Sequence, residues 1–470
     1  MINSGGKGNS GDPNANKRQK FEEYLENQIT EELSSLYSFE TINVDISSSD
    51  DDTFKGNVII NSSEGPDKQL IEFLDSYLKG HLAEYSVIYN EEEKINTTES
   101  SELKEETAIA PYMNDFDLLW DELQNSYPYY EYFNETIDME ELYKSFAAEV
   151  ATIENEGRFV NLIQRLTKEL GGFAHLGLIS NEQYQMYYYL FVLDESVSGE
   201  SNPFSSILQD PRLSDMYVPP VTSDAYEGTM SETFGLPYVT YYDDCNALYI
   251  KITSFSHSLI GRDENIVYDA LTKYPDTENV IFDIRGNQGG STSYWDHILL
   301  EPFGGCYEYT GRQYFKSSEL VNQFWPIETS SPVDELEAVP EWVKSYGLDR
   351  YNEFRIVLPE NGADTTYNDI KRWVLVDEAV YSSSESFVNF CKVTNWATVV
   401  GYKTSGDGMG STPLLLLLPD SGLLVRFSYV AAENDKGECD AVRGTVPDLI
   451  CFKKDVPLNK CLDAIREQDD

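Results

Sequence analysis

Basic residues, histidines and long apolar runs are all scarce in this sequence of 470 residues. It has 34 lysines and arginines against 82 aspartates and glutamates, a formal net charge of −48. Phosphate groups and anionic lipids are bound by clusters of Lys and Arg, so this balance argues against a nucleic-acid partner and against docking on anionic membranes. No apolar run is long enough to cross a bilayer, and we expect no integral membrane segment.

The six cysteines are also few and scattered. They form no CxxC pair and no Cys/His spacing typical of a zinc site, so we expect neither a metal nor an organic cofactor. Their spacing leaves open whether any of them form a disulfide near the C-terminus. The sequence likewise leaves the oligomeric state open.

The first hundred residues predict a tether followed by a small accessory unit. Residues 1–20 are rich in Gly, Ser and Asn and predict a flexible tether. An exported lipoprotein begins in this way after its signal is removed, which places the protein outside the cell or in the envelope; an ordinary disordered start has the same composition. Residues 21–97 mix helix and strand patterns, an α+β unit, and the polar stretch 98–108 predicts a linker.

The remaining chain predicts a mixed α/β (α+β) protein. Residues 109–190 have apolar residues at helical spacing, and residues 191–236 form an irregular connector rich in Ser, Pro and Tyr. In residues 237–457 buried strands alternate with helices, which favours a β-sheet flanked by helices. Residues 458–470 are expected to form a C-terminal tail.

Three consecutive serines follow one of these buried strands. The run "RWVLVD" leads into "AVYSSSESFVNF", Ala379 to Phe390, where a helix pattern begins. A serine at such a corner can expose its hydroxyl, and the next backbone N–H can stabilise an oxyanion at the helix N-terminus. The alternative is that Ser382 caps the helix, since serine is a preferred N-cap, and its position alone favours this structural role.

A second motif, "FDIRGNQGG", ends another buried strand with Gly289 and Gly290. Paired glycines let the backbone approach a ligand closely, and their N–H groups can complete an oxyanion hole. The alternative is a tight turn in which Asp283 and Arg285 pair for structural reasons.

A general base would come from only four histidines, which are His81, His175, His257 and His297. His175 lies in the glycine-flanked corner "GGFAHLG", His257 follows a strand, and His297 lies in a helix pattern beside the glycine motif. Position alone does not select among them, because a single histidine is more often structural than catalytic.

Taken in order, these motifs resemble the tail-specific (C-terminal processing) serine peptidase family, which includes relatives of the tricorn protease core. "VIFDIRGNQGG" resembles that family's "DLRxNxGG" segment, "YSSSESF" its nucleophile segment, "VVGYKTSGDGMG" its downstream glycine-rich stretch, and "GTVPD" its closing element. The resemblance covers residues 116–457 and implies a crotonase-like ClpP/tail-specific protease core in residues 237–457. No PDZ-like signature stands between His175 and Tyr238.

The resemblance implies a role for particular residues. The family nucleophile lies three positions before the Glu of this segment, here Glu385, which makes it Ser382. The oxyanion donors would be the amides of Ser383 and of Gly289 or Gly290. The Ser–Lys branch keeps its lysine where this chain has Asp407, and Lys403 is out of register. The resemblance is therefore closer to the tricorn-like Ser–His branch, with His175 as the base.

The acid that orients the histidine is harder to place. In the tricorn-like branch a Glu shortly before the "G-x-x-P-D" element has this role, but counting back three residues from Gly444 reaches Ala441. Asp440 and Glu438 are the nearest acids, and Asp440 is closer in register. We therefore expect Asp440 to be the third catalytic residue, with Asp407 as its rival.

The resemblance implies a serine endopeptidase that cleaves polypeptides among exported or envelope proteins through an acyl-enzyme. The alternative is a catalytically inactive binding protein on the same scaffold, as in the retinoid-binding relatives of these peptidases. The tyrosine-rich segment "YQMYYYLFVLD" could line such a binding site, although ordinary packing explains it equally well.

Overall fold

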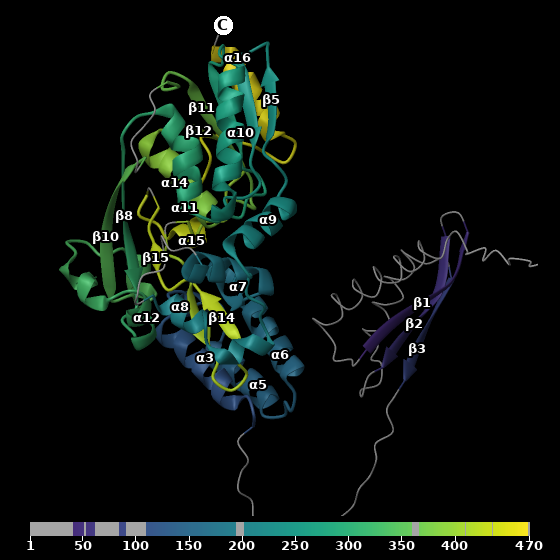
Figure 1. The fold of residues 1–470 in the computed structure, drawn as a ribbon. Coiled ribbons are helices and arrows are strands. Elements are labelled where there is room, and N and C mark those ends of the chain that lie inside the picture. Colours follow the sequence, from purple (N-terminus) through teal and green to yellow (C-terminus); the bar gives the residue numbers. More distant parts are fainter. Residues whose placement is uncertain are drawn as a thin grey trace, which may run out of the picture. The chain divides into compact units, whose positions relative to one another are not determined.

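The computed structural model describes most of the chain from residue 110 onward and three strands before it (Figure 1). The described residues are 41–50, 53–61, 84–90, 110–193, 202–359, 366–408, 410–434 and 436–468. They belong to two compact units, one of residues 1–110 and 152–166 and one of residues 111–151 and 167–470. The expected tether (1–20) and linker (98–108) lie outside the described residues.

The first unit contains a three-stranded sheet. Strands β1 (Thr41–Asp50) and β2 (Thr53–Asn61) pair antiparallel, and β2 pairs parallel with β3 (Glu84–Asn90). The strand patterns expected within residues 21–97 are confirmed at β1, which contains "TINVDI", and at β2, which contains "GNVII". The sequence did not predict β3, and the two helices expected in this unit fall almost entirely outside the described residues.

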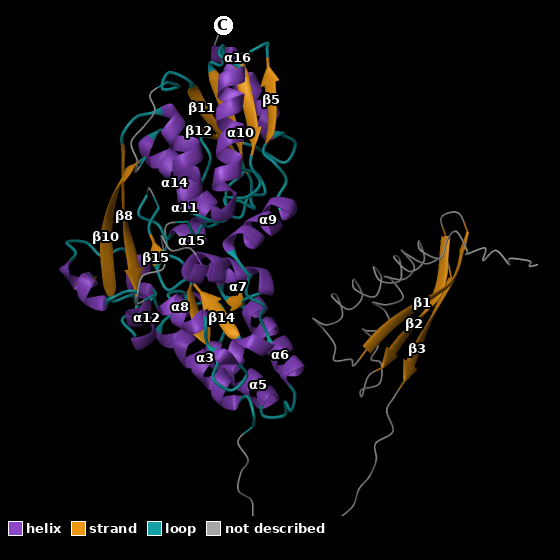
Figure 2. Cartoon of the chain, viewed as in Figure 1, coloured by secondary structure: helices purple, strands orange, loops and turns teal. Residues whose placement is uncertain are grey.

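A six-stranded sheet forms the centre of the second unit (Figure 2). Its order is β16 (Leu449–Ile450), β12 (Thr398–Gly401), β11 (Lys371–Val376), β7 (Asn279–Asp283), β6 (Ala247–Lys251) and β5 (Tyr238–Tyr242). All neighbouring pairs are parallel except β5–β6 at the edge. The buried apolar runs of the sequence form these parallel strands, because such strands are covered on both faces. The predicted α/β architecture is confirmed.

Alternate residues of each strand supply the two faces of this sheet. Val280 and Phe282 lie in one apolar cluster, and Ile281 between them lies in the other. The first cluster is completed by helices α10 (Ile260–Lys273), α11 (Thr292–Trp295) and α14 (Ser383–Thr394), and the second by α16 (Pro457–Gln468). Residues 458–470, expected to be a tail, therefore largely form a packed helix, because Cys461, Leu462 and Ile465 cover the sheet.

Two smaller sheets and a set of helices complete the second unit. One sheet has the order β15 (Ala431–Ala432), β8 (Tyr307–Phe315), β10 (Arg350–Leu358) and β9 (Ser331–Pro332). The other has the order β13 (Leu414–Leu417), β14 (Leu424–Phe427) and β4 (Gly177–Leu178). The helices of this unit not yet named are α3 (Met113–Asn125), α4 (Tyr130–Asn134), α5 (Met139–Val150), α7 (Asn181–Tyr188), α8 (Pro203–Leu208), α9 (Ser223–Thr233), α12 (Glu319–Phe324), α13 (Glu341–Ser345) and α15 (Asp440–Arg443). Most of α6 (Glu156–Glu169) lies in residues 152–166, which are assigned to the first unit.

The helical segment and the peptidase-like segment are more closely joined than the sequence suggested. Strand β4 comes from residues 109–190 but pairs with β14, more than two hundred residues later in the chain. The buried carboxylate of Asp115 in α3 also accepts hydrogen bonds from the Asp420 and Ser421 N–H groups, at 2.8 and 2.7 Å. The connector 191–236, expected to be irregular, contains α8 and α9 among its described residues.

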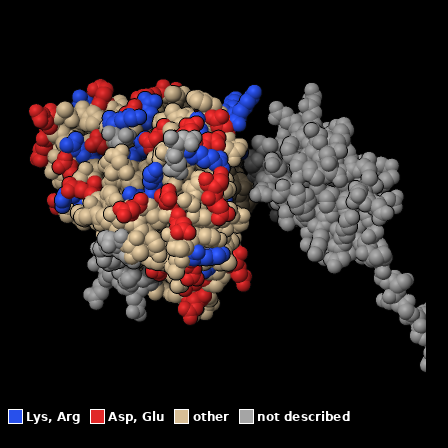
Figure 3. Space-filling model, turned by 90° about the horizontal axis from the view of Figure 1, so that it is seen from above, with Lys and Arg blue, Asp and Glu red and all other residues tan. Residues whose placement is uncertain are grey.

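Charged residues are mixed on the described surface. Figure 3 shows acidic and basic side chains interspersed on the face seen from above, without a broad basic patch on the coloured part of that face. No helix among the described residues is both long and apolar enough to cross a membrane. All six cysteines are free thiols, so the disulfide left open by the sequence is not formed.

Candidate active site

Three loops meet at the carboxyl ends of neighbouring parallel strands. Residues 284–290 follow β7, residues 377–382 follow β11, and residues 402–412 follow β12, which flanks β11 on its other side. Ligands of open α/β sheets bind in the crevice outside these carboxyl ends. The fold therefore brings together the three motifs that the sequence analysis identified separately.

Ser382 stands at the corner between the second of these loops and α14. Its backbone has φ 56° and ψ −129°, and its side chain makes no capping hydrogen bond. Ser383 and Ser384 are buried, and the Ser384 hydroxyl donates to Asn287 Oδ1 at 2.8 Å. Ser382 is the partly exposed serine of the three. The structural alternative, an N-cap serine, does not describe this geometry.

The glycine loop lies directly against Ser382. A Cβ atom on Gly289 would lie 2.8 Å from Ser383 N and 3.0 Å from Ser382 Cβ, and its φ of +104° also requires glycine. The Gly289 N–H donates to Asn287 Oδ1 at 2.9 Å, so it is already engaged. The Gly289 carbonyl accepts from Phe255 N–H at 3.0 Å. Because the peptide group is planar and trans, the Gly290 N–H points to the opposite side from Phe255.

Two backbone donors are thus available beside Ser382. Neither the Ser383 nor the Gly290 N–H has a hydrogen-bond partner within the part of the chain that the structure describes. Asp283 and Arg285, in contrast, pair as the structural alternative predicted: Arg285 Nε donates to Asp283 Oδ1 at 2.8 Å.

His175 reaches this corner through an unusual backbone and a strand pairing. Gly171 and Gly172 end α6 with positive φ, and Ala174 and His175 in the 3₁₀ turn Phe173–His175 have φ of 51° and 63°. The next residues form β4, whose pairing with β14 brings Ser428 beside the histidine. Ser428 N–H donates to the Ala174 carbonyl at 2.8 Å.

One nitrogen of His175 is bound by a buried polar cluster. Nδ1 lies 2.7 Å from Asp407 Oδ2 and 3.1 Å from both Ser428 Oγ and the Tyr381 hydroxyl oxygen. The Tyr381 and Ser428 hydroxyls also donate to Asp407 Oδ2, at 2.8 and 3.0 Å. Burial and then the charge of Asp407 raise the pKa of Tyr381, so this phenol stays protonated and can donate. Nδ1–H is therefore placed to donate to the carboxylate, and in the neutral imidazole Nε2 is then the nitrogen that can accept a proton.

Ser382 and His175 are not hydrogen-bonded to each other in this structure. His175 Nε2 and Ser382 Oγ make no hydrogen bond to each other or to other described residues. The two residues are linked through Tyr381, which precedes Ser382 and whose ring centroid lies 4.7 Å from that of His175. Catalytic hydrogen bonds are often long before substrate binds.

Backbone strain also concentrates here. Six described residues other than glycine have positive φ, of which two are asparagines; the other four are Ala174, His175, Ser382 and Asp407. Such conformations cost about 1–3 kcal/mol each and cluster at functional sites. Strain at three side chains that come together in space, from three distant parts of the chain, supports a functional role for this corner.

Asp440, the acid expected from the sequence, has other partners. Its Oδ2 accepts from the Gly408 N–H at 2.8 Å, and its Oδ1 from Asn389 Nδ2 at 3.1 Å. The carboxylate beside His175 is that of its rival, Asp407. Register along the chain favoured Asp440, but the backbone turn at Asp407 (φ 58°) directs its side chain at the histidine. Lys403 is exposed.

Sequence reasoning missed Tyr381 and Ser428. Tyr381 directly precedes Ser382, which is a weak signal, and nothing in "RFSYV" marks Ser428.

The remaining histidines lie elsewhere. His81 is outside the described residues. His257 Nδ1 lies 3.4 Å from Ser291 Oγ. Both His257 and His297 line a cavity of about 600 Å³, together with Tyr189, Glu227, Arg262 and Ser293.

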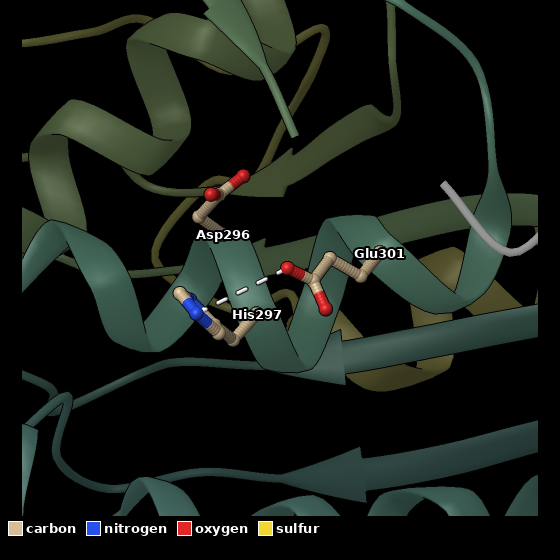
Figure 4. Close-up of side chains that lie close together, drawn as sticks. All are labelled: Asp296, His297 and Glu301. Atoms are coloured by element: carbon tan, nitrogen blue, oxygen red, sulfur yellow. Dashed lines mark ion pairs between the residues drawn. The ribbon is translucent and has the colours of Figure 1, made fainter. Parts of the chain in front are cut away.

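His297 also belongs to a small polar cluster. Its Nδ1 bonds the Ser293 carbonyl at 2.9 Å, while its Nε2 lies 4.0 Å from Glu301 Oε1 (Figure 4). Within the described residues, Asp296, His297 and Glu301 are the group whose ligand atoms lie within 4.8 Å of one another.

Comparisons with known proteins give one family match and several similar solved structures. The model of peptidase family S41 matches residues 246–451. A search of curated proteins gave no significant match. Two solved structures are similar at low identity: a lipoprotein from Streptococcus agalactiae (12% identity, TM-score 0.44, covering 78% of this chain and 99% of that one), and mature CPAF complexed with lactacystin (13%, 0.45, 76% and 97%). The photosystem II D1 C-terminal processing protease is similar over a shorter part (15%, 0.29, 45% and 43%).

The family match defines the class of this protein. The matched segment includes the glycine loop, the serine corner, Asp407 and the "GTVPD" element. Residues 246–451 match peptidase family S41, and the protein is a serine-type peptidase hydrolase. Its substrates are polypeptides.

Proposed function

We propose that this peptidase cleaves internal peptide bonds through an acyl-enzyme on Ser382, with His175 as general base and Asp407 as the acid that orients it. The observation that carries the proposal is the convergence of a partly exposed serine, two free backbone donors and a histidine whose Nδ1 is bound to a buried carboxylate. A serine hydroxyl is a weak nucleophile without such a base.

The proposed reaction follows from these positions. Ser382 Oγ attacks the scissile carbonyl carbon while its proton moves to His175 Nε2. The Ser383 and Gly290 N–H groups bind the oxyanion, and Gly289 supports them by close packing. His175 Nε2–H then protonates the leaving amine, the C–N bond breaks and an ester remains on Ser382. A water activated by His175 hydrolyses this ester and releases the new carboxyl end.

The sequence-based choice of the third residue is revised by this proposal. Asp407 takes the orienting role because its carboxylate lies 2.7 Å from His175 Nδ1. Asp440 instead accepts a hydrogen bond from Gly408 N–H, in the loop that carries Asp407. The cavity beside Ser291 and Ser293 is proposed to receive substrate side chains near the scissile bond.

Covalent labelling tests the mechanism directly. A fluorophosphonate probe that reacts with activated serines is expected to label the protein once, at Ser382, as read by mass spectrometry of the digest. A folded protein that is never labelled and hydrolyses no peptide would instead support the inactive binding protein. The tyrosine-rich segment does not favour that alternative, since Tyr184, Tyr187 and Phe191 are packed in an apolar core.

Asp407→Asn is expected to lower kcat by about 10³–10⁴-fold. An amide NH₂ facing Nδ1 favours the tautomer that carries its proton on Nε2, which cannot act as a base. Asp440→Asn keeps an oxygen that can accept from Gly408 N–H, so its loss should stay below about tenfold. Steady-state kinetics and thermal unfolding of both variants would show which aspartate orients His175. A large loss for Asp440→Asn with a mild effect of Asp407→Asn would restore Asp440 as the orienting acid.

The cellular setting is proposed on the family resemblance alone. It places the substrates among exported or cell-envelope polypeptides and the protein outside the cell or in the envelope. Fractionation of the native protein would test this.

A further inference from the structure

Two carboxyl groups are buried together behind the nucleophile. Glu385, in the first turn of α14, is 0% exposed, and Asp440, the first residue of α15, is 1% exposed. The Asn389 amide connects them, donating to Glu385 Oε1 at 3.4 Å and to Asp440 Oδ1 at 3.1 Å. The Thr445 hydroxyl donates to Glu385 Oε1 at 2.6 Å. Two ionised carboxylates in one dry site repel each other strongly.

The same pair holds the loop that carries Asp407. Asp440 Oδ2 accepts from Gly408 N–H at 2.8 Å, one residue after Asp407. A Cβ atom on Gly408 would lie 2.3 Å from Ser386 N and 2.6 Å from Glu385 Cβ, so the loop packs directly on the first turn of α14. Any shift of either carboxyl group is therefore transmitted to the residue bonded to His175.

We propose that the two carboxyl groups carry one negative charge, on Asp440, while Glu385 stays protonated, and that a second negative charge, on Glu385, would displace the loop that holds Asp407 against His175. Glu385 and Asp440 are thus positioning residues, because they act through Asp407. The catalytic consequence rests on the proposed function; the single charge of the buried pair does not.

The surrounding groups allow Glu385 to be the one that titrates near neutral pH. Burial, followed by the negative charge of Asp440, raises the pKa of Glu385 from 4.5 to about 8. Burial also raises the pKa values of the Tyr129 and Tyr309 phenols well above 10 and that of the Cys439 thiol to about 12. These neighbours stay neutral up to pH 9. Asp407 is the other acid at the loop, and Arg443 of α15 is exposed and lies 3.8 Å from Glu438.

The sign of the pH effect follows from the raised pKa. Between pH 4.5 and about 8 the native state holds a proton on Glu385 that the unfolded state has lost. Stability therefore decreases as pH rises through this window and is unaffected by Glu385 above it. Activity falls at the upper end of the window. There Glu385 ionises beside Asp440, and the hydrogen bond from Gly408 N–H to Asp440 shifts with the displaced carboxylate.

The test compares wild type with Glu385→Gln, an uncharged mimic of the protonated acid. The profile of kcat/KM against pH from 6 to 10 is expected to fall near pH 8 in wild type and to lack this alkaline decrease in Glu385→Gln, with activity at pH 7 within about threefold. Glu122→Gln is the matched control, since Glu122 on α3 also has a pKa raised by burial. It should keep the wild-type profile. An unchanged alkaline decrease in Glu385→Gln would overturn the proposal.

A second measurement does not depend on activity. Urea unfolding at pH 5 and pH 8.5 should show a larger loss of stability for wild type than for Glu385→Gln. Glu122→Gln should reduce this loss less than Glu385→Gln does, because Glu122 is only half-buried. Equal losses in wild type and Glu385→Gln would contradict the single-charge pair. If wild type proved inactive on every peptide, the proposed function would fail, and this measurement would still decide the state of the pair.

Discussion

Replacing Ser382 with alanine should reduce peptide hydrolysis by at least about 10³-fold and leave the free energy of unfolding nearly unchanged. The hydroxyl is the attacking group, and it makes no hydrogen bond that helps to hold α14. Alanine has a Cβ like serine, so the backbone strain at φ 56° stays as it was. Turnover of a fluorogenic peptide, probe labelling and urea unfolding together provide the measurement.

The neighbouring serines are the matched controls for this prediction. Ser383→Ala keeps the backbone N–H proposed for the oxyanion hole and should remain active. Ser384→Ala loses the 2.8 Å hydrogen bond to Asn287. It should therefore lower the free energy of unfolding and leave the rate of peptide hydrolysis nearly unchanged. Near-normal hydrolysis by Ser382→Ala would refute the assignment of the nucleophile.

Replacing His175 with alanine should cost about 10³–10⁴-fold in kcat, because it removes the base proposed to take the serine proton. Its pH profile is the more specific measurement. Wild-type kcat/KM should rise from the acid side as the base loses its proton, and the residual activity of His175→Ala should lack this step.

His257→Ala and His297→Ala serve as controls for the base. Both histidines line the cavity beside the glycine loop, so their removal should alter KM for some peptides more than kcat. If His175→Ala kept the acid-side step and one of these variants lost it, the base would have to be reassigned to that histidine.

Much of the fold could be predicted from local sequence. The apolar runs that became β6, β7, β11 and β12 are buried on both faces, and parallel strands of this kind have a continuous apolar pattern. The packing of α16 and the β4–β14 pairing could not be predicted. Both depend on which distant surface an amphipathic or short segment meets, and local periodicity does not encode that partner.

In the candidate site, too, some residues could be predicted from sequence spacing and others could not. Among the serines, the spacing to Glu385 selected Ser382, which is the partly exposed one of the three. The spacing before Gly444 selected Asp440, which is buried and accepts a hydrogen bond from the N–H of Gly408, the residue after Asp407. A count along the chain fixes neither the direction of a side chain nor its burial.

The sequence by itself determined the class of protein and the order of its parts, since the glycine motif and serine corner must follow the strands that carry them. Only the tertiary structure decided which acid meets His175 and which glycine N–H is free. Positive φ at His175 and Asp407 accompanies the 2.7 Å contact between these side chains from distant segments, and the Phe255 bond to the Gly289 carbonyl leaves the Gly290 N–H pointing the other way. Such conformations are stable only when surrounding packing enforces them, and that packing exists only in the folded chain.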